Sequence, residues 1–502
     1  MILRRVVSSG LLALMVGGLA GCGRSDTGAI DVAMIAPDPH FSGDARPGWV
    51  TAATTEPPLW PALSATRAGL VAFDSDGRLT PSLAERWIVT DDALGYIFRL
   101  RDAQWADGTP ITAADVAVAL RHTLDALRGT PLGRDLAPIR TVRAMARRVV
   151  EIDLDNAQPD LLTLLAQPEL AIAAGPRGQR HAGAMDLKRE GDHWLARLIA
   201  PDRPGLAPVP YPAAPRALAL RFQTAEAAVA RFARGDADCV LGGSFATLPL
   251  ATRLAMARGN LMFDPVVGLF GIDVVSDQGL LGDALNREAL AMAIDRDALV
   301  AAFGVGGWQP TTRIVTPGLD GDSGAVAERW TDRTPAQRRS DAAARIVHWQ
   351  AAHPGTPHLT LLLPAGPGSD ILFQRLHDDW AAIGITLDRA TRVQGADLVL
   401  VDQVARYPRA RWYLNRLTCA QHRPICTPVG DATLKSAIEA PDANAPELYA
   451  EAEGIMTQAN GFIPLARPLR WSLTHGSMIG LSANPAGWHP LPPLAAGDTT
   501  GN

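Results

Sequence analysis

Residues 242–246, with the sequence GGSFA, place a serine in a glycine-rich turn after the apolar run ADCVL. The nucleophile turn of many hydrolases has the pattern Gly-x-Ser-x-Gly, which exposes the serine hydroxyl for covalent catalysis. Here the fifth position is Ala246, so the pattern is incomplete. The two glycines would instead let a ligand approach the backbone closely. Ser244 and Phe245 are therefore candidate ligand contacts, with an ordinary glycine turn as the alternative interpretation.

Two groups of residues have side chains that bind metals. In CAQHRPIC, Cys419, His422 and Cys426 lie close together, but zinc sites use four ligands and the Cys-x-x-Cys spacing is absent. A local disulfide between Cys419 and Cys426 is the favoured interpretation in an oxidising compartment. The second group, LHDDW at residues 376–380, lies in a predicted amphipathic helix, where a solvated face explains the acidic residues and the histidine.

The sequence predicts no catalytic residue, no metal site and no cofactor. It contains no His-Glu-x-x-His motif and no glycine-rich loop of the kind that binds phosphates. The 502 residues carry a net charge of −5, and the isoelectric point is about 6.1. Without a basic footprint, we expect no nucleic-acid partner. The composition, 47% hydrophobic and 20% charged, is that of a globular protein.

The first residues have the pattern of an export signal. Arg4 and Arg5 precede the apolar run 6–18, which is too short for a comfortable membrane span. The run leads into Leu-Ala-Gly-Cys at residues 19–22, which resembles a bacterial lipobox. The resemblance implies cleavage after residue 21, lipidation of Cys22, and an exported lipoprotein anchored in a membrane and facing the periplasm or cell exterior. A plain signal peptide with an incidental cysteine is the alternative.

Mixed helical and strand patterns predict an α/β chain. Residues 96–105 alternate apolar and charged side chains like a half-exposed strand, and residues 396–402 form an apolar run typical of a strand buried on both faces. Thr112 and Asp115 form a predicted capping box before a helix with one apolar stripe. Further helices are predicted over 284–294 and 296–303, and another from the Ser340 cap to about residue 352.

Several segments, in order, resemble bacterial extracellular solute-binding proteins of family 5, the peptide-binding components of ABC importers. The strongest resemblance is continuous over residues 76–120, DGRLTPSLAERWIVTDDALGYIFRLRDAQWADGTPITAADVAVAL. It continues in ARFARGDADCV at 230–240, NREALAMAIDRDALV at 286–300 and GFIPLARPLRW at 461–471. The ordered set spans nearly the whole chain after the signal.

The resemblance implies a two-lobed type II periplasmic-binding-protein fold with an extra small subdomain. The expected division of the chain is a lipoprotein signal peptide at 1–21, a lipidated tether at 22–28, lobe I at 29–50, 148–265 and 455–490, the small subdomain at 51–147, lobe II at 266–454, and a disordered tail at 491–502. It also implies a monomer that captures a small, peptide-like solute by hinge closure and delivers it to the membrane permease.

The resemblance places ligand contacts in the second lobe as well. Asp402, Arg409 and Trp412 lie where the family has such contacts, and Trp308 after GVGG is either a stacking wall or a loop anchor. For Arg409, a surface salt bridge is the alternative interpretation. The sequence departs from the family at Asp273, where an asparagine is usual.

A second departure is ARYPRA at 405–410, which has Arg406 and Arg409 where many peptide binders have acidic residues near the ligand amine. A buried ammonium needs a carboxylate partner, so an ordinary peptide is in doubt as the ligand. Two hypotheses remain open. Either Asp402 replaces the missing acid, or the arginines bind a ligand carboxylate through paired hydrogen bonds.

Two other classes of function remain as alternatives. One is a binding or sensor lipoprotein on the same fold that no longer serves a transporter, and the other is a hydrolase. Nickel or haem capture, which some relatives of the family perform, also stays open.

Overall fold

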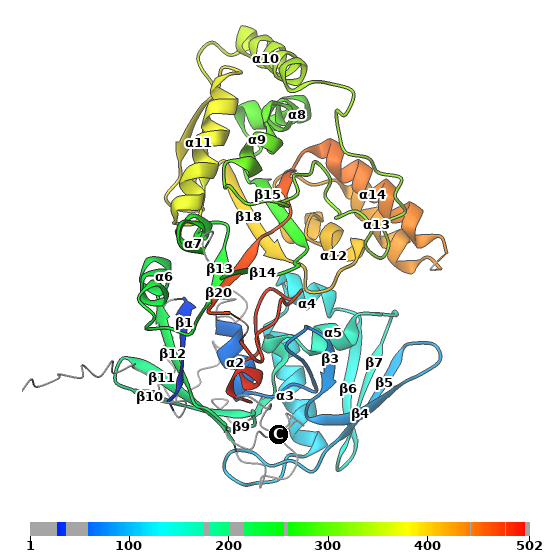
Figure 1. Cartoon of the computed structure of the whole chain (residues 1–502). Helices are drawn as coiled ribbons and strands as arrows, with labels where there is room; N and C mark the ends of the chain where they lie inside the picture. Colours follow the sequence, from blue (N-terminus) through cyan, green and yellow to red (C-terminus); the bar gives the residue numbers. More distant parts are fainter. Residues whose placement is uncertain are drawn as a thin grey trace, which may run out of the picture.

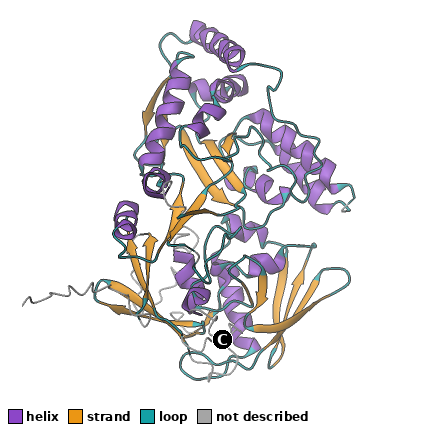
Figure 2. Ribbon diagram, viewed as in Figure 1, coloured by secondary structure: helices purple, strands orange, loops and turns teal. Residues whose placement is uncertain are grey.

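The structure, a computed structural model, describes residues 28–36, 59–174, 180–199, 215–255, 260–441, 443–476 and 478–496. The expected signal peptide, Cys22 and the tether up to residue 27 lie outside the described residues, as do residues 37–58. Helices and strands are mixed along the described chain, in an α/β arrangement (Figure 2).

The first large sheet has seven strands in the order β10-β11-β12-β1-β13-β20-β14. β1 lies at its centre, parallel to β12 on one side and to β13 on the other, and its residues are almost entirely buried. The strands are β1 (Ile30–Ile35), β10 (Met185–Glu190), β11 (His193–Leu198), β12 (Leu218–Gln223), β13 (Cys239–Ser244), β14 (Leu261–Phe263) and β20 (Arg470–Thr474). The associated helices are α2 (Trp60–Thr66), α6 (Ala225–Ala233) and α7 (Leu248–Ala255).

The second large sheet has five strands in the order β17-β16-β18-β15-β19. Its strands are β15 (Gly268–Val274), β16 (His358–Leu362), β17 (Thr386–Arg389), β18 (Leu398–Val404) and β19 (Phe462–Ala466). The helices of this part are α8 (Ala284–Ala293), α9 (Arg296–Ala301), α10 (Pro335–Ala352), α11 (Pro367–Ala381), α12 (Ala410–Asn415), α13 (Pro428–Glu439) and α14 (Ala445–Ala459), with 3-10 turns η3 (Gly279–Gly282) and η4 (Cys419–Gln421).

A third, smaller body is built on a four-stranded antiparallel sheet in the order β4-β5-β7-β6. It comprises β2 (Val71–Phe73), β3 (Leu79–Pro81), β4 (Ala84–Val89), β5 (Gly95–Leu100), α3 (Ala113–Ala126), α4 (Pro131–Asp135), β6 (Ile139–Ala146) and β7 (Val149–Leu154). Next in the chain are α5 (Leu161–Leu165), η2 (Pro168–Leu170), β8 (Ala173–Ala174) and β9 (Arg180–His181). The Thr112–Asp115 capping box is present at the start of α3.

The two large sheets define two lobes that the chain joins at two adjacent crossings (Figure 1). One crossing leads from β14 to β15 through residues 264–267, and the other leads from β19 back to β20 through residues 467–469. Because β14 pairs with β20 and β15 pairs with β19, the crossings run side by side. All described residues from 268 to 466 are therefore inserted between two neighbouring strands of the first sheet.

Several boundaries differ from the expected division. The boundary at 147 falls in the turn between β6 and β7, and β7 pairs with β5 and β6 rather than with the first lobe. Likewise the boundary at 454 falls within α14, and β19, which follows it, pairs with β15 in the second lobe. The expected disordered tail is wrong for residues 491–496, where η5 (Pro492–Ala496) begins and the side chains of Leu491 and Leu494 are buried in the first lobe.

Two predicted elements also differ. α10 begins at Pro335 after a capping box of Thr334 and Gln337, five residues before the predicted Ser340 cap. Proline is favoured in the first helical turn because its missing N–H has no partner there. β18, predicted to be buried on both faces, has only Leu398 fully buried, and its later residues are partly exposed.

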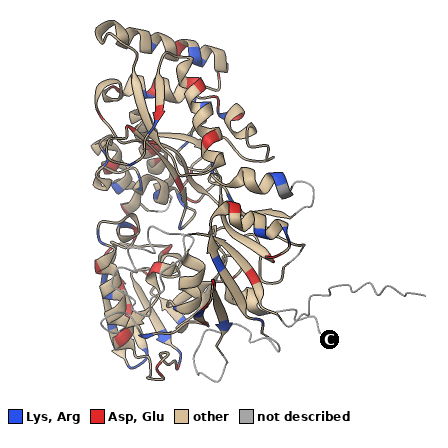
Figure 3. Cartoon of the chain, turned by 90° about the vertical axis from the view of Figure 1, so that its left-hand side faces the viewer, with Lys and Arg blue, Asp and Glu red and all other residues tan. Residues whose placement is uncertain are grey.

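Within the described chain, no helix is long and apolar enough to cross a membrane. On the side drawn in Figure 3, acidic and basic segments are intermixed over both lobes.

A disulfide closes the loop after α12, between Cys419 and Cys426. The loop carries Arg423, whose guanidinium forms a paired ion contact with Asp273 on β15 and donates to the carbonyl oxygen of Gly461 at 2.9 Å. Burial raises the pKa of the Asp273 carboxyl to about 6, although Arg423 opposes the rise. Asp273 thus stands where the family usually has an asparagine, and the disulfide loop supplies the cation that pairs with its carboxylate.

Asp273→Asn tests this arrangement through the pH dependence of stability. The folded protein holds the Asp273 proton up to about pH 6, whereas an unfolded chain releases it near pH 4. The proton on Asp273 therefore stabilises the folded state fully below about pH 4. This stabilisation is lost as pH rises through about 6, by no more than about 1.4 kcal/mol per pH unit. We expect urea unfolding to show the wild type losing stability relative to the variant between pH 4 and 6.

Asp370→Asn, at an exposed carboxylate paired with Arg389, is the matched surface control. A wild type that gains stability relative to Asp273→Asn over the same pH range would contradict the raised pKa.

Candidate ligand-binding site

A cavity of about 790 Å³ lies at the carboxyl ends of three parallel strands, β12, β1 and β13. In open α/β sheets, ligands bind at this edge because the loops that follow the strands diverge there. The volume suits a solute of drug or short-peptide size. The cavity is lined by Met34, Ile35, Ala36, Pro61, Phe222, Gln223, Thr224, Leu241, Gly242, Ser244, Pro364, Ala365, Arg470, Gly487, Trp488 and His489.

Both lobes contribute to this cavity. Pro364 and Ala365 come from the loop between β16 and α11 in the second lobe, whereas the strand ends belong to the first. Arg470 lies where the chain re-enters the first lobe at β20. Any relative motion of the lobes would therefore change the width of the cavity.

An ion pair joins the lobes beside the cavity. Nη1 of Arg470 on β20 donates to both carboxylate oxygens of Asp402 on β18 at 2.9 Å, and Nη2 donates to the Asp402 carbonyl oxygen at 3.2 Å. Burial raises the pKa of Asp402, and the Arg470 guanidinium opposes that rise. Arg470 lines the cavity and Asp402 does not, so a ligand would meet the cation of this pair.

Two further polar side chains of the lining have an unused atom. Gln223 Nε2 and His489 Nδ1 are both buried and have no hydrogen-bond partner within the described chain. Buried polar atoms are usually satisfied, so these two atoms mark the places where a ligand could complete the hydrogen bonding.

His489 is also close to a serine and an aspartate. Ser472 Oγ is 3.2 Å and Asp264 Oδ2 is 3.4 Å from its Nε2 atom. A hydrolytic triad instead needs the serine on one ring nitrogen and the carboxylate on the other. Both contacts here use the same nitrogen, and Ser472 is only 1% exposed. The group therefore has triad residue types without the triad arrangement.

Among the residues expected to contact ligand, the structure brings Ser244 to the cavity. Its neighbour Phe245 is fully buried and packs edge-on against Phe270, with ring centroids 4.9 Å apart. Trp308 is buried beside the same Phe270, and its indole N–H donates to the Arg467 carbonyl oxygen at 2.7 Å. Both aromatic residues belong to the core that spans the lobes, and for Trp308 the loop-anchor interpretation holds.

Arg409 and Trp412 lie away from the cavity, where the second lobe meets the smaller body. Arg409 forms ion pairs with Asp160 and Asp320, as its salt-bridge interpretation predicted. Trp412 is 1% exposed and packs against Tyr413 and Arg416. Neither residue lines the cavity, so both predicted ligand contacts are corrected to interface residues.

Three arginines of the segment 406–416 pair with carboxylates from residues 135–169. Arg406 binds Glu169 at 2.6 Å, Arg409 binds Asp160 at 2.7 Å and Arg416 binds Asp135 at 2.8 Å. Arg406 also donates to Gln167, and Asp135 accepts from Tyr407 and Asn415. Arg406 and Arg409 are thus engaged elsewhere, and the hypothesis that they bind a ligand carboxylate is not supported.

The sequence analysis missed most of the lining, including Gln223, Arg470, Trp488 and His489, together with Pro364 and Ala365. Gln223 is the last residue of β12, so the strand-end rule could have indicated it. Arg470 begins β20, and the other four come from loops with no local signal.

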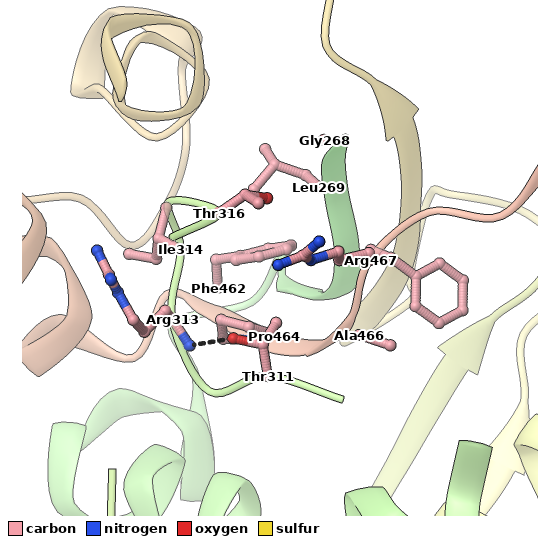
Figure 4. A pocket seen from close by; sticks show the side chains of 11 residues that line it. Gly268, Leu269, Thr311, Arg313, Ile314, Thr316, Phe462, Pro464, Ala466 and Arg467 are labelled. Atoms are coloured by element: carbon pink, nitrogen blue, oxygen red, sulfur yellow. Dashed lines mark hydrogen bonds between the residues drawn. The ribbon is translucent and has the colours of Figure 1, made fainter. Parts of the chain in front are cut away.

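Two other cavities lie near the candidate site. One, of about 10 Å³, has room for a single water. Figure 4 shows Arg467 pointing into it toward Phe462 and Thr316. The second, of about 320 Å³, lies between α2, the β2–β3 hairpin and residues 488–493. Trp488 lines both this cavity and the 790 Å³ cavity. Within the described ranges, no group of three or more His, Cys, Asp or Glu residues could hold a metal ion.

Replacing the arginines at the interface should separate structural residues from ligand contacts. Arg416 and Asp135 have side chains only 6% and 0% exposed, so Arg416→Ala leaves a buried carboxylate without its cation and should cost about 3–5 kcal/mol in urea unfolding. Arg409→Ala removes a pair that is one-third exposed at the arginine and should cost about 1 kcal/mol or less. A larger loss for Arg409→Ala than for Arg416→Ala would contradict this ranking.

The sequence and structure were compared with known proteins. A family described as "Bacterial extracellular solute-binding proteins, family 5 Middle" matches residues 78–422. The "probable deoxycholate-binding periplasmic protein" of Escherichia coli K12 is 24% identical over 323 residues, 57% of this chain and 58% of the relative. A periplasmic oligopeptide-binding protein of Haemophilus influenzae is 22% identical over 312 residues, 56% of each chain. The chain thus matches a little over half the length of these curated relatives.

The solved structure of the Haemophilus influenzae oligopeptide-binding protein, in complex with the peptide RPPGFSPFR, superposes with a TM-score of 0.79 at 17% identity. The superposition covers 93% of this chain and 99% of that one, which confirms the two-lobed fold with its extra small subdomain. The family match extends over more than half of the chain. The chain belongs to family 5 of the bacterial extracellular solute-binding proteins.

Proposed function

We propose that the chain captures a small organic solute, peptide-like in size, between its lobes and delivers it to the membrane permease of an ABC importer. The observation that carries the proposal is the 790 Å³ cavity at the carboxyl ends of β12, β1 and β13, with Pro364 and Ala365 of the second lobe on its opposite side. The family and the similar proteins are binding proteins rather than enzymes. The solutes named for those relatives are said of the relatives and are not assigned to this chain.

Capture follows from the way the lobes are joined. Two side-by-side crossings, at residues 264–267 and 467–469, allow one lobe to rotate against the other as a hinge. A ligand shifts such an equilibrium by the difference between its affinities for the open and closed forms. No bond is made or broken, and the closed shape is the signal for the permease. The chain acts as a monomer in this scheme.

The proposal includes export and anchoring. Cleavage after residue 21 and lipidation of Cys22 would leave the two lobes outside the cytoplasmic membrane, on a short tether at residues 22–28. The support is the lipobox-like sequence at residues 19–22. Stable attachment needs more than one acyl chain, and a lipobox cysteine carries a diacylglycerol and an amide-linked acyl group.

Filling the cavity from the second lobe tests solute capture. Ala365 is exposed in the loop after β16 and lines the cavity, so Ala365→Trp should fold normally while occupying ligand space. We expect the amount of solute that co-purifies with the protein, quantified by mass spectrometry after denaturation, to fall at least tenfold. Ala381→Trp, at the exposed end of α11, is the matched control. Unchanged solute binding by Ala365→Trp would contradict capture in this cavity.

Anchoring is tested by Cys22→Ala in a bacterial host. We expect the variant to lose the mass of the lipid and to move from the membrane fraction to the soluble fraction. Cys239→Ala, which removes the buried free thiol of β13, should leave the protein in the membrane fraction. A Cys22→Ala protein that stays in the membrane fraction would argue against the lipid anchor.

A further inference from the structure

The charges that line the 790 Å³ cavity are unusual for a pocket that would accept a free peptide amine. Arg470 and His489 are the titratable residues among the described lining residues, and none of these residues is a carboxylate. Nine of the others are apolar: Met34, Ile35, Ala36, Pro61, Phe222, Leu241, Pro364, Ala365 and Trp488. A solute in this cavity would therefore bury mainly apolar surface against aliphatic and aromatic side chains.

The carboxylate that contacts Arg470 is already occupied. Both oxygens of Asp402 accept hydrogen bonds from Nη1 of Arg470 at 2.9 Å, and the two side chains are only 15% and 17% exposed. Arg470 lines the cavity, whereas Asp402 does not. An ammonium approaching Asp402 would have to displace Arg470, which would then lose its own anion. This disfavours the hypothesis that Asp402 binds a ligand amine.

Gln223 and Arg470 offer hydrogen-bond donors to a ligand. Gln223 Nε2 is a buried amide nitrogen with two hydrogens and no partner within the described chain. The Arg470 guanidinium has five N–H donors and no acceptor, and its Nη1 and Nη2 atoms already donate to Asp402 and to the Leu469 carbonyl oxygen. His489 Nδ1 is also without a partner, and although a neutral imidazole nitrogen can accept a hydrogen bond from an ammonium, it supplies no negative charge.

These groups discriminate between solutes by charge. Taking an ammonium out of water is unfavourable unless a carboxylate compensates the charge, whereas a carbonyl or carboxylate oxygen would satisfy the free donors. We propose that this cavity takes a mainly apolar solute that carries no ammonium group and that accepts hydrogen bonds from Gln223 and Arg470. The inference rests on the proposed function and specifies the chemical class of its solute.

A matched pair of peptides tests the inference on the wild-type protein. Tri-leucine and N-acetyl-tri-leucine have the same apolar side chains and the same terminal carboxylate, and they differ in the ammonium group. Isothermal titration at pH 7 should give a dissociation constant at least tenfold lower for the acetylated peptide. Equal or tighter binding of free tri-leucine would overturn the inference, as would a co-purified solute that bears an ammonium group.

Two variants assign the effect to residues. Asp402→Asn removes the carboxylate and leaves the Arg470 cation, so the affinity for N-acetyl-tri-leucine should stay within about threefold of the wild type or increase. Gln223→Leu replaces the amide donor with an apolar side chain of similar size. The affinity for N-acetyl-tri-leucine should then fall about tenfold. Asp370→Asn, in an exposed ion pair with Arg389, is the matched control. Each variant is first checked for an unchanged circular dichroism spectrum.

Loss of acetylated-peptide binding in a folded Asp402→Asn protein would contradict the inference, because Asp402 would then be a ligand contact. The peptide pair requires no variant, so the test stands even if Asp402→Asn does not fold. A wild-type protein that binds neither peptide and carries no solute would contradict the proposed function itself. A protein that binds only amine-bearing solutes would contradict the solute class alone.

Discussion

The arrangement of this chain depends on one topological constraint, the return of the backbone to the first sheet directly beside the place where it left. β14 and β20 are neighbours in one sheet, and β15 and β19 are neighbours in the other. Everything between them forms the second lobe, which is held by two adjacent strands and by a shared core that includes Phe245, Phe270 and Trp471. The space between the lobes is a consequence of this connection.

The arginine-rich segment 406–416 does not form an anion-binding site, because its arginines are paired with carboxylates outside the cavity. Guanidinium groups pair with carboxylates through planar, paired hydrogen bonds and lose little freedom on doing so. Arg406, Arg409 and Arg416 each meet a carboxylate of the chain itself, and Asp135 and Glu169 are fully or almost fully buried. These pairs join the second lobe to residues 135–169, and the cations of this segment are neutralised within the chain itself.

Much of the fold could be predicted because its signals are local. The capping box at Thr112 and the helix predicted at 284–294 depend on residues within a few positions of one another. α10 was predicted too short because Ser340 also fits a cap, whereas Thr334-Pro335 with Gln337 satisfies the first turn better. The site was harder to predict because its lining comes from seven separate stretches of chain. Phe245 was misassigned because the backbone turns after β13 and carries its ring into the core.

One indole ring is shared by two cavities. Trp488 lines both the 790 Å³ cavity and the 320 Å³ cavity, and it packs edge-on against Phe73, with ring centroids 6.3 Å apart. Contacts of this kind are worth about 0.5–1.5 kcal/mol beyond burial. Any change in the rotamer of Trp488 would therefore alter the walls of both cavities at once.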